Sequence, residues 1–276
     1  ERAMSKHLKS SRISVPDIRA RKGHEKIVCL TAYTAPMADI LDPHVDLILV
    51  GDTVGMVFHG LPSTVGVTLD MMIMHGQAVM RGSSHALVVV DLPFGSYESS
   101  PQQAFESAAR IMAETGCQAV KVEACEGIAE TVAFLSGRGI PVVGHVGLRP
   151  QAINIDGGFK TKGRTADERT RVLAEAHAVA EAGAFAIVVE GVASDLADQI
   201  TKEIPVPTIG IGASPKCDGQ ILVTDDMIGL FEWTPKFVRR YADLRTTISA
   251  AVGEYANDVR SGQFPGPAEI YTLKVG

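Results

Sequence analysis

Short apolar runs that each end in an ionisable residue recur along the chain and limit the folds open to it. They end at Asp52, Asp91, Glu123, His145 and Glu190. Continuous runs of Val, Ile, Leu and Ala are typical of parallel strands buried on both faces. In folds built from such strands, functional groups lie at the carboxyl ends of the strands. We therefore expect these five side chains to converge on one site.

Eight strand-like runs alternate with helical segments, without a change of composition between them. Strands are expected at 27–32, 46–50, 87–90, 119–122, 141–144, 185–189, 206–210 and 220–223. Helices are expected at 35–41, 69–81, 100–114, 128–136, 167–182, 194–201 and 235–260. This alternation predicts an α/β fold, a single (β/α)8 TIM barrel over residues 14–276 that includes the C-terminal helix and tail.

The N-terminal part of the sequence is expected to add two features to this fold. A short helix beginning at Ser14, with Pro16 in its first turn, is expected to cap the bottom of the barrel. Residues 1–13 are polar and are expected to form a flexible leader, with a trimmed transit peptide as the alternative. A doubly wound sheet is the alternative fold. A closed ring fits the consecutive ionisable tips more naturally, because all of them then face one pocket.

Composition excludes several classes of protein. The formal net charge of −6 argues against a nucleic-acid partner, which usually needs a basic surface. No apolar run reaches the ~20 residues of a membrane span. The four cysteines contain no Cys-x-x-Cys pair, which favours a reducing compartment and hence the cytoplasm. We expect small molecules as substrates, without a nucleic acid or a membrane as partner.

Two loops are candidates for functional elements. Residues 53–63 are rich in glycine and follow the Asp52 tip, where a lid or a wall of the site is expected. Residues 147–164 lack a helical period and are too long for a plain connection, which also indicates function.

Three of the strand tips suggest a metal site. Asp52, Asp91 and Glu123 end neighbouring strands, and adjacent strands lie ~4.8 Å apart. Three such carboxylates repel one another unless a cation lies between them. Oxygen ligands favour Mg²⁺, with Mn²⁺ next. The alternative is that each carboxylate caps a helix or pairs with an arginine.

The other ionisable residues suggest acid–base chemistry. Lys121 shares a strand face with Glu123, where it either offsets the carboxylates or holds a substrate carboxylate. His145 is placed to bind an anion or to move a proton, although a satisfied core histidine has the same spacing. Glu190 follows an apolar run, which favours a general base over an acid paired with a nearby cation.

Together these groups suit a 2-oxo acid. Its keto and carboxylate oxygens can chelate a divalent cation that has open positions, and the cation then stabilises the enolate formed when a base removes the C3 proton. An enolate needs an electrophile. The sequence therefore points to the formation or cleavage of a C–C bond next to a carbonyl.

Seven motifs carry a resemblance that extends from about Ser14 to Leu230. They are 50–55 (Val-Gly-Asp-Thr-Val-Gly), 91–97 (Asp-Leu-Pro-Phe-Gly-Ser-Tyr), 120–123 (Val-Lys-Val-Glu), 144–151 (Gly-His-Val-Gly-Leu-Arg-Pro-Gln), 157–160 (Gly-Gly-Phe-Lys), Glu190, and 210–220. In this order they resemble the ketopantoate (3-methyl-2-oxobutanoate) hydroxymethyltransferase family.

The resemblance implies an activity and an assembly. Members transfer a hydroxymethyl group from the co-substrate 5,10-methylenetetrahydrofolate to 3-methyl-2-oxobutanoate, through a Mg-stabilised enolate. The product, 2-dehydropantoate, leads to pantothenate and coenzyme A. The resemblance also implies a TIM barrel that assembles into a homodecamer of two pentameric rings.

Site roles carry over by position. Asp52, Asp91 and Glu123 correspond to the metal cluster, in which Asp52 and Asp91 are the expected direct ligands and Glu123 acts directly or through water. Mg²⁺ is expected, with Mn²⁺, Zn²⁺ or Co²⁺ as alternatives. Thr53, Lys121 and His145 correspond to further ketoacid contacts beside Asp52 and Asp91, and Glu190 corresponds to the catalytic base.

The sequence departs from the family pattern at a few positions. Thr53 stands where Ser is common, Ala124-Cys125 where Gly-Gly is usual, and Ser214 where Gly is usual. These changes bear on loop conformation and folate affinity, whereas the residues expected to carry the chemistry are all present.

Two rival functions fit part of the pattern. Barrels of the isocitrate lyase and phosphoenolpyruvate mutase type also hold a 2-oxo acid enolate on Mg²⁺, but the cysteine loop of isocitrate lyases is not seen here. A barrel that binds a metabolite without turnover would not need Glu190 opposite a metal cluster.

Overall fold

Eight parallel strands close into a barrel in the order in which they occur along the chain. The computed structural model describes residues 12–272. The strands are β1 Ile27–Thr31, β2 Leu47–Val50, β3 Leu87–Asp91, β4 Ala119–Glu123, β5 Val142–Gly147, β6 Ala186–Glu190, β7 Thr208–Ile211 and β8 Gly219–Leu222. Each strand pairs with the next, and β8 pairs with β1. The (β/α)8 prediction is confirmed and the doubly wound alternative is wrong.

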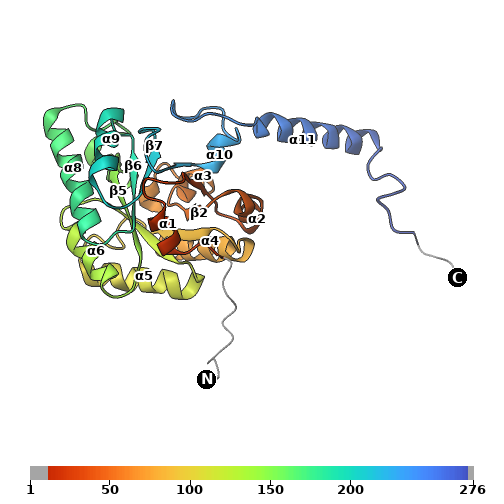
Figure 1. The fold of residues 1–276 in the computed structure, drawn as a ribbon. Helices are drawn as coiled ribbons and strands as arrows, with labels where there is room; N and C mark the ends of the chain where they lie inside the picture. The colour runs from red at the N-terminus through yellow and green to blue at the C-terminus, as the bar shows by residue number, and fades with distance from the viewer. Residues whose placement is uncertain (1–11, 273–276) are drawn as a thin grey trace, which may run out of the picture. The chain divides into compact units, whose positions relative to one another are not determined.

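Helices follow most strands and lie around the barrel (Figure 1). They are α2 Ala35–Leu41, α4 Leu69–Gly82, α5 Pro101–Thr115, α6 Ile128–Ser136, α8 Ala166–Glu181 and α9 Ser194–Glu203, with short helices α3 Val54–Val57 and α7 Ile153–Asp156 and 3₁₀ turns Asp42–His44, Thr64–Gly66 and Pro150–Ala152. Predicted caps explain their ends. Ser100 accepts a hydrogen bond from the backbone N of Gln103, and Gly116 ends α5 with a φ of 79°.

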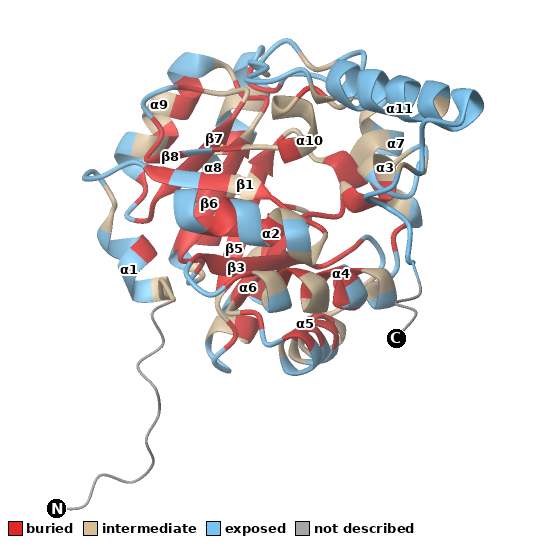
Figure 2. Ribbon diagram, turned by 90° about the vertical axis from the view of Figure 1, so that its right-hand side faces the viewer, coloured by how far each residue is buried: buried red, intermediate tan, exposed pale blue. Residues whose placement is uncertain are grey.

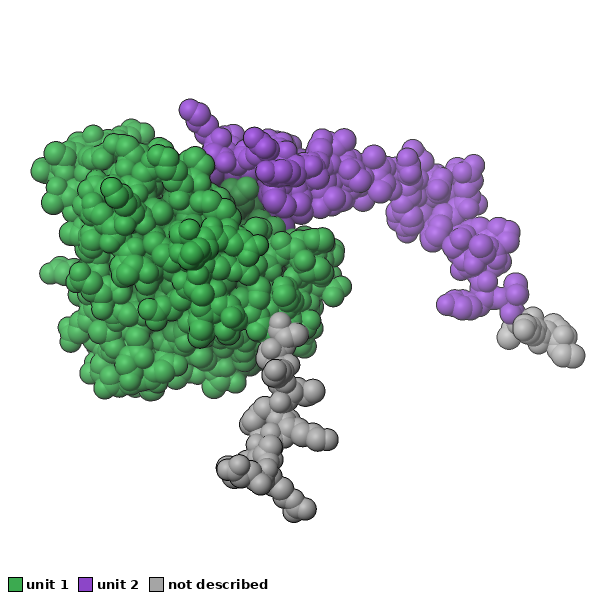
Figure 3. Space-filling model, in the orientation of Figure 1, with its two compact units in different colours: residues 1–223 green, residues 224–276 purple. Residues whose placement is uncertain are grey.

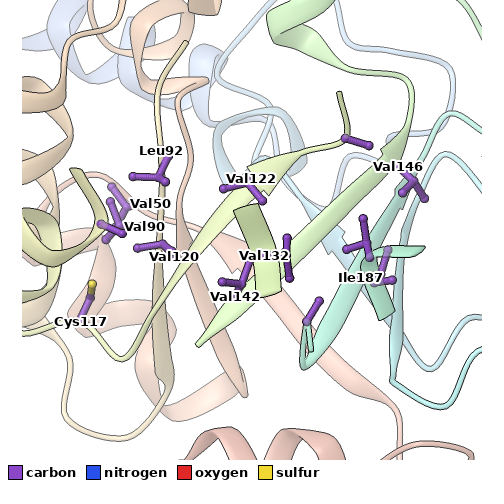
Figure 4. Packing of buried hydrophobic residues seen from close by; sticks show 14 of the residues in the cluster. Val50, Val90, Leu92, Cys117, Val120, Val122, Val132, Val142, Val146 and Ile187 are labelled. Atoms are coloured by element: carbon purple, nitrogen blue, oxygen red, sulfur yellow. The ribbon is translucent and has the colours of Figure 1, made fainter. Parts of the chain in front are cut away.

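Alternate residues of each strand belong to different layers of the core. One layer packs the outward-facing side chains of the strands against the helices, and Figure 4 shows Val50, Val90 and Val120 lying together in it. The other layer fills the barrel and includes Leu49, Val89 and Val143. Because the strand period is two, a residue two positions after an inner residue also faces inward. The strands themselves are almost entirely buried (Figure 2).

The N-terminal helix α1, Val15–Ala20, caps the barrel as expected. Ser14 and Asp17 form a capping box at its start. Ile18 is fully buried and belongs to the inner layer, beside Ile27 and Phe185. The predicted leader lies outside the described residues as far as residue 11. Its last two residues, Arg12 and Ile13, are instead bonded to the segment before β3, through Ser83, His85 and Ala86.

Four local predictions were wrong. The loop at 53–63 contains α3, and the loop at 147–164 contains a 3₁₀ turn and α7, because single turns are too short to give a helical period. The last long helix is α11, Leu244–Ser261, and does not begin near residue 235. Asp243 caps α11 by accepting a hydrogen bond from the backbone N of Thr246. Helix α9 begins after Ala193 without a side-chain cap, although Ser194 or Asp195 was expected in that role.

The chain divides into two compact units, residues 1–223 and residues 224–276 (Figure 3). The second unit contains α10, Thr224–Met227, and α11. No residue of α11 is buried. Four of its apolar side chains, Ile248, Val252, Tyr255 and Val259, are 45–59% exposed. In the part of the chain that the structure describes, no helix is both long enough and apolar enough to cross a membrane.

Candidate active site

The register of strands β3 to β6 brings the predicted ionisable residues together. Asp91 lies opposite Lys121 across the β3–β4 pair, and Glu123 lies opposite His145 across the β4–β5 pair. These four residues continue the inward-facing alternation of Val89, Ala119 and Val143. Glu190 ends β6 opposite Gly147. The predicted convergence of these strand tips inside the barrel mouth is therefore observed.

Asp52 also lies in this group. It follows Gly51, two residues after the end of β2. Its backbone N donates a hydrogen bond to Asp91 Oδ2 at 3.0 Å. A Cβ on Gly51 would lie 2.9 Å from Thr53 Oγ1, so a larger residue here would displace the Thr53 hydroxyl. Thr53 Oγ1 lies 2.7 Å from the Tyr33 hydroxyl. The sharp turn after β2 thus sets Asp52 and Thr53 beside Asp91.

A row of charged side chains crosses the site. Lys121 Nζ lies 3.1 Å from Asp91 Oδ1 and 3.4 Å from His145 Nδ1. His145 lies between two acids, with Nδ1 3.5 Å from Glu123 Oε1 and Nε2 3.1 Å from Glu190 Oε2. The Asp91 Oδ1 and His145 Nε2 contacts are ionic, since neither atom has a hydrogen-bond partner of good geometry among the described residues. Both atoms therefore retain the capacity to bind a ligand.

Burial and neighbouring charge shift the acid–base equilibria of these groups. Burial raises the pKa of Asp52, and the charges of Asp91 and Glu123 raise it further. Burial also raises the pKa of Asp91, against the opposing effect of Lys121. Burial alone would lower the pKa of Lys121, but the three nearby carboxylates outweigh it and raise that pKa. The two aspartates therefore lie where a further positive charge would be strongly stabilised.

His145 carries a charge at neutral pH. Burial and the Lys121 ammonium would lower its pKa, but the contacts with Glu123 and Glu190 outweigh them and raise the pKa to about 9. As an imidazolium it offers a proton on both ring nitrogens. His145 is therefore suited to donate to an anionic ligand oxygen beside Glu190.

Two buried side chains in the site were not predicted to act there, Gln151 and Tyr97. Gln151 Nε2 donates to Asp52 Oδ2 at 2.8 Å, and its backbone N donates to Glu123 Oε2 at 3.1 Å. Tyr97 donates to Gln151 Oε1 at 2.6 Å. Both residues lie within motifs of the family resemblance, at 91–97 and 144–151. Membership of these motifs was the sequence signal that could have identified them, because neither residue directly follows an apolar run.

The donor set can be tested against a divalent cation. Among residues 12–272, no three His, Cys, Asp or Glu side chains are grouped closely enough to enclose a metal ion. Asp52 and Asp91 are nevertheless held side by side, and Asp91 Oδ1 is buried without a hydrogen-bond partner. Mg²⁺ commonly uses one or two protein carboxylates and takes its other ligands from water and substrate. The pair formed by Asp52 and Asp91 fits that pattern.

Solved structures support the fold of the chain. A putative phosphonomutase from Burkholderia cenocepacia J2315 superimposes with a TM-score of 0.65 at 15% identity, covering 87% of this chain and 98% of the other. 2,3-Dimethylmalate lyase, described as a PEP mutase/isocitrate lyase superfamily member, gives a TM-score of 0.60 at 14% identity and covers 95% and 89%. At such identities the likeness extends to the barrel fold alone.

Sequence relatives are much closer. A protein of Phenylobacterium zucineum named 3-methyl-2-oxobutanoate hydroxymethyltransferase is 68% identical over 275 residues, covering 99% of this chain and 100% of the relative. Proteins of the same name from Maricaulis maris (67%, covering 96% and 95%) and Caulobacter vibrioides (63%, covering 98% and 99%) also match. The family model described as ketopantoate hydroxymethyltransferase matches residues 12–267. The chain belongs to the ketopantoate hydroxymethyltransferase family and is an enzyme, a hydroxymethyltransferase.

Proposed function

We propose that this enzyme transfers a hydroxymethyl group from 5,10-methylenetetrahydrofolate to 3-methyl-2-oxobutanoate and releases 2-dehydropantoate. The names of relatives that are 63–68% identical over nearly the whole chain support this substrate. One observation in the site carries the chemistry. The charged pair of His145 and Glu190 lies across Lys121 from the paired aspartates, so that a base and a cation site lie beside each other.

In this proposal Asp52 and Asp91 hold a divalent cation, Mg²⁺ or alternatively Mn²⁺, Zn²⁺ or Co²⁺, and Glu123 acts through water. When bound, the cation would supply Lewis-acid stabilisation of the negative charge that develops on the keto oxygen. The three carboxylates already lie close enough for their charges to raise the pKa of Asp52, and an added cation relieves that repulsion.

The remaining residues act on the ketoacid directly. Lys121 and His145 are both positively charged and buried, so they attract the substrate carboxylate and keep it in the pocket. The Thr53 hydroxyl, paired with Tyr33, supplies a further contact at the β2 tip. Glu190 is the most exposed of the group, with 18% of its side chain accessible against 2% for His145. It is therefore the acid best placed to meet a substrate C3 proton and remove it.

The co-substrate, the pathway and the assembly belong to the same proposal. Methylenetetrahydrofolate provides the one-carbon electrophile, and the product enters pantothenate and coenzyme A synthesis in the cytoplasm. The four cysteines are free, as a reducing compartment requires. The enzyme assembles into a homodecamer of two pentameric rings. The exposed apolar side chains of α11, spaced by four, three and four residues, support a contact with a second copy of the chain.

A deuterium-exchange experiment tests this function. The protein is incubated with 3-methyl-2-oxobutanoate and Mg²⁺ in D₂O, and the C3 proton is followed by NMR. We expect exchange without folate, and 2-dehydropantoate once methylenetetrahydrofolate is added. Absence of both would refute the proposal. Exchange without product would leave the enolisation but point to another electrophile, and binding without exchange would favour a barrel that does not catalyse turnover.

A further inference from the structure

Gln151 connects three strand tips, two through its side chain and one through its backbone N. It lies in the 3₁₀ turn Pro150–Ala152 after β5, yet its amide reaches Asp52 beyond β2 and the carbonyl of Leu92 beyond β3, at 2.8 and 3.0 Å. Its backbone N reaches Glu123 Oε2 at the end of β4. The side chain is buried. These hydrogen bonds connect the 147–164 segment to the carboxylates of Asp52 and Glu123.

The hydrogen bonds fix the direction of the amide. The backbone N of Glu123 donates to the Tyr97 hydroxyl oxygen at 3.1 Å, which leaves the Tyr97 proton to be donated to Gln151 Oε1. The NH₂ group of Gln151 then uses both protons, one on Asp52 and one on Leu92 O. A flipped amide would set its oxygen against a carboxylate and a carbonyl. Only one orientation satisfies every partner, and Tyr97 enforces it.

The same bonds orient the carboxylates. Gln151 donates to Oδ2 of Asp52 and Oε2 of Glu123. The second oxygen of each carboxylate, Asp52 Oδ1 and Glu123 Oε1, receives no hydrogen bond from Gln151, and Glu123 Oε1 faces His145. Partners of this kind set the direction of a metal ligand and commonly account for 10–100-fold in metal affinity.

We propose that Gln151, held by Tyr97, is a positioning residue that orients Asp52 and Glu123 for cation binding. This inference rests on the cation site of the proposed function. Tyr97 acts only through Gln151 at Asp52, so the two residues form a single unit with respect to that ligand.

Mn²⁺ binding to the free full-length protein tests the inference. Binding is measured by calorimetry on the parent, Gln151→Met, Tyr97→Phe and the double variant. Methionine has nearly the same length as glutamine and lacks the amide. We expect Gln151→Met to weaken Mn²⁺ binding by about 10-fold or more. Tyr97→Phe should weaken it less. The double variant should lose less than the sum of the two single losses, because Tyr97 reaches Asp52 through Gln151 and has a separate contact only at the Glu123 backbone N.

Two controls separate positioning from damage to the fold. Gln77→Met makes the same chemical change on α4, where Gln77 Nε2 donates to Glu114 O, and should leave Mn²⁺ binding unchanged. Saturating Mn²⁺ should restore most of the C3 exchange in Gln151→Met, which a misfolded protein would not show. Should Gln151→Met fail to fold, Tyr97→Phe alone must still weaken binding.

Parent-like Mn²⁺ binding in both single variants, or independent losses that add in the double variant, would overturn the inference. Failure of the proposed function gives a different result. In that case the parent protein would show no C3 exchange, while its Mn²⁺ affinity would still fall on substitution of Gln151.

Discussion

His145 is the residue on which the charges of the site meet, since Lys121, Glu123 and Glu190 all lie within 3.5 Å of its ring nitrogens. Two of these three neighbours are acids, and they keep the imidazole protonated at neutral pH. A protonated histidine cannot accept a proton from substrate. This supports the proposal that the base is a carboxylate, Glu190, whose side chain is 18% accessible.

Glu190→Gln is expected to abolish most of the C3 exchange while leaving ketoacid binding intact. The amide keeps the size of the side chain and its hydrogen bonding but cannot take a proton, so the exchange rate should fall by about 10²- to 10⁴-fold. NMR exchange in D₂O and ligand titration measure the two effects. Glu203→Gln is the matched control, because Glu203 forms a similar pair with His177 on the surface at 3.0 Å. Exchange at the parental rate in Glu190→Gln would place the base elsewhere.

Asp91→Asn is expected to raise the Mg²⁺ concentration that half-saturates exchange by at least about tenfold, since it removes the charge of an expected ligand. Asparagine preserves the shape of the residue, although Lys121 then loses its closest partner. A Mg²⁺ titration of the exchange rate gives the value. Asp70→Asn, on the exposed surface of α4, should have no effect. An unchanged titration for Asp91→Asn would remove Asp91 from the ligand set.

The sequence predicted the strand-tip residues but missed those supplied by loops. Asp91, Glu123 and Glu190 each end an apolar run, so the register of a parallel barrel brings them to one end. Gln151 and Tyr97 lie in irregular segments, where no period shows which way a side chain points. Which oxygen of Asp52 is bonded, and to what, depends on loop geometry that only coordinates reveal. The roles assigned to Thr53, Lys121 and Glu190 stay predictions.

At the scale of elements, β5 packs closely against α8 because Gly144 has no side chain. A Cβ on Gly144 would lie 2.3 Å from Val179 Cγ1 of α8. We expect Gly144→Ala to destabilise the enzyme by about 1–3 kcal/mol, as overpacking of a core typically does. Urea unfolding measures this.

Gly253 of α11 is the control for this substitution, because an added Cβ there meets nothing within 4 Å. Gly253→Ala should be neutral, or stabilising by up to about 1 kcal/mol through helix propensity. Equal effects of the two substitutions would contradict the packing argument.

Asp218, just before β8, connects the segment before β1 to the start of β7. It accepts hydrogen bonds from Lys22 Nζ, Gly23 N and Thr208 N at 2.9 Å each. Burial would raise its pKa, but these bonds outweigh burial and lower it. A folded-state pKa below the unfolded value of about 3.9 adds stability that is fully present above that pH. The contribution is lost as the pH falls through the folded pKa.

Asp218→Asn is therefore expected to lower stability at pH 7 by about 1.5–3 kcal/mol, because hydrogen bonds to a charged acceptor are the strong ones. The difference in Tm between parent and variant should shrink below about pH 4. Thermal unfolding at pH 3 to 7 measures it. A difference that stays constant over this range would exclude the charge of Asp218 as the cause.

Boundaries of several helices were well predicted, with or without a side-chain cap. Helices α2 and α6 match their predicted ranges, and α5 begins at the proline that follows its Ser100 cap. The C-terminal helix was predicted to begin at Pro235, but it begins nine residues later at Leu244, and its side-chain cap is formed by Asp243.

At the scale of the whole molecule, α11 carries the prediction about assembly. Its stripe of Ile248, Val252, Tyr255 and Val259 is about half exposed in a single chain, and water contact of that kind is unfavourable. We expect the parent to sediment at the mass of ten chains. Val252→Glu should shift it to smaller species, because a buried carboxylate without a partner is costly. Glu254→Gln, on the same helix but outside the stripe, should sediment like the parent. A decamer that survives Val252→Glu would show that α11 is not the contact.

Closure of the barrel by β1 and β8 has a consequence for synthesis of the chain. The two strands pair from Ile27 with Gly219 to Leu30 with Leu222, so the ring cannot be completed until nearly the whole barrel sequence has left the ribosome. Until then β1 and β7 are open edges, and unpaired edges are templates for aggregation. Asp52, Asp91, Lys121, Glu123 and His145 all belong to earlier strands. The site can therefore begin to assemble while the sheet still has two open edges that can aggregate. Pairing of β8 with β1 closes both edges.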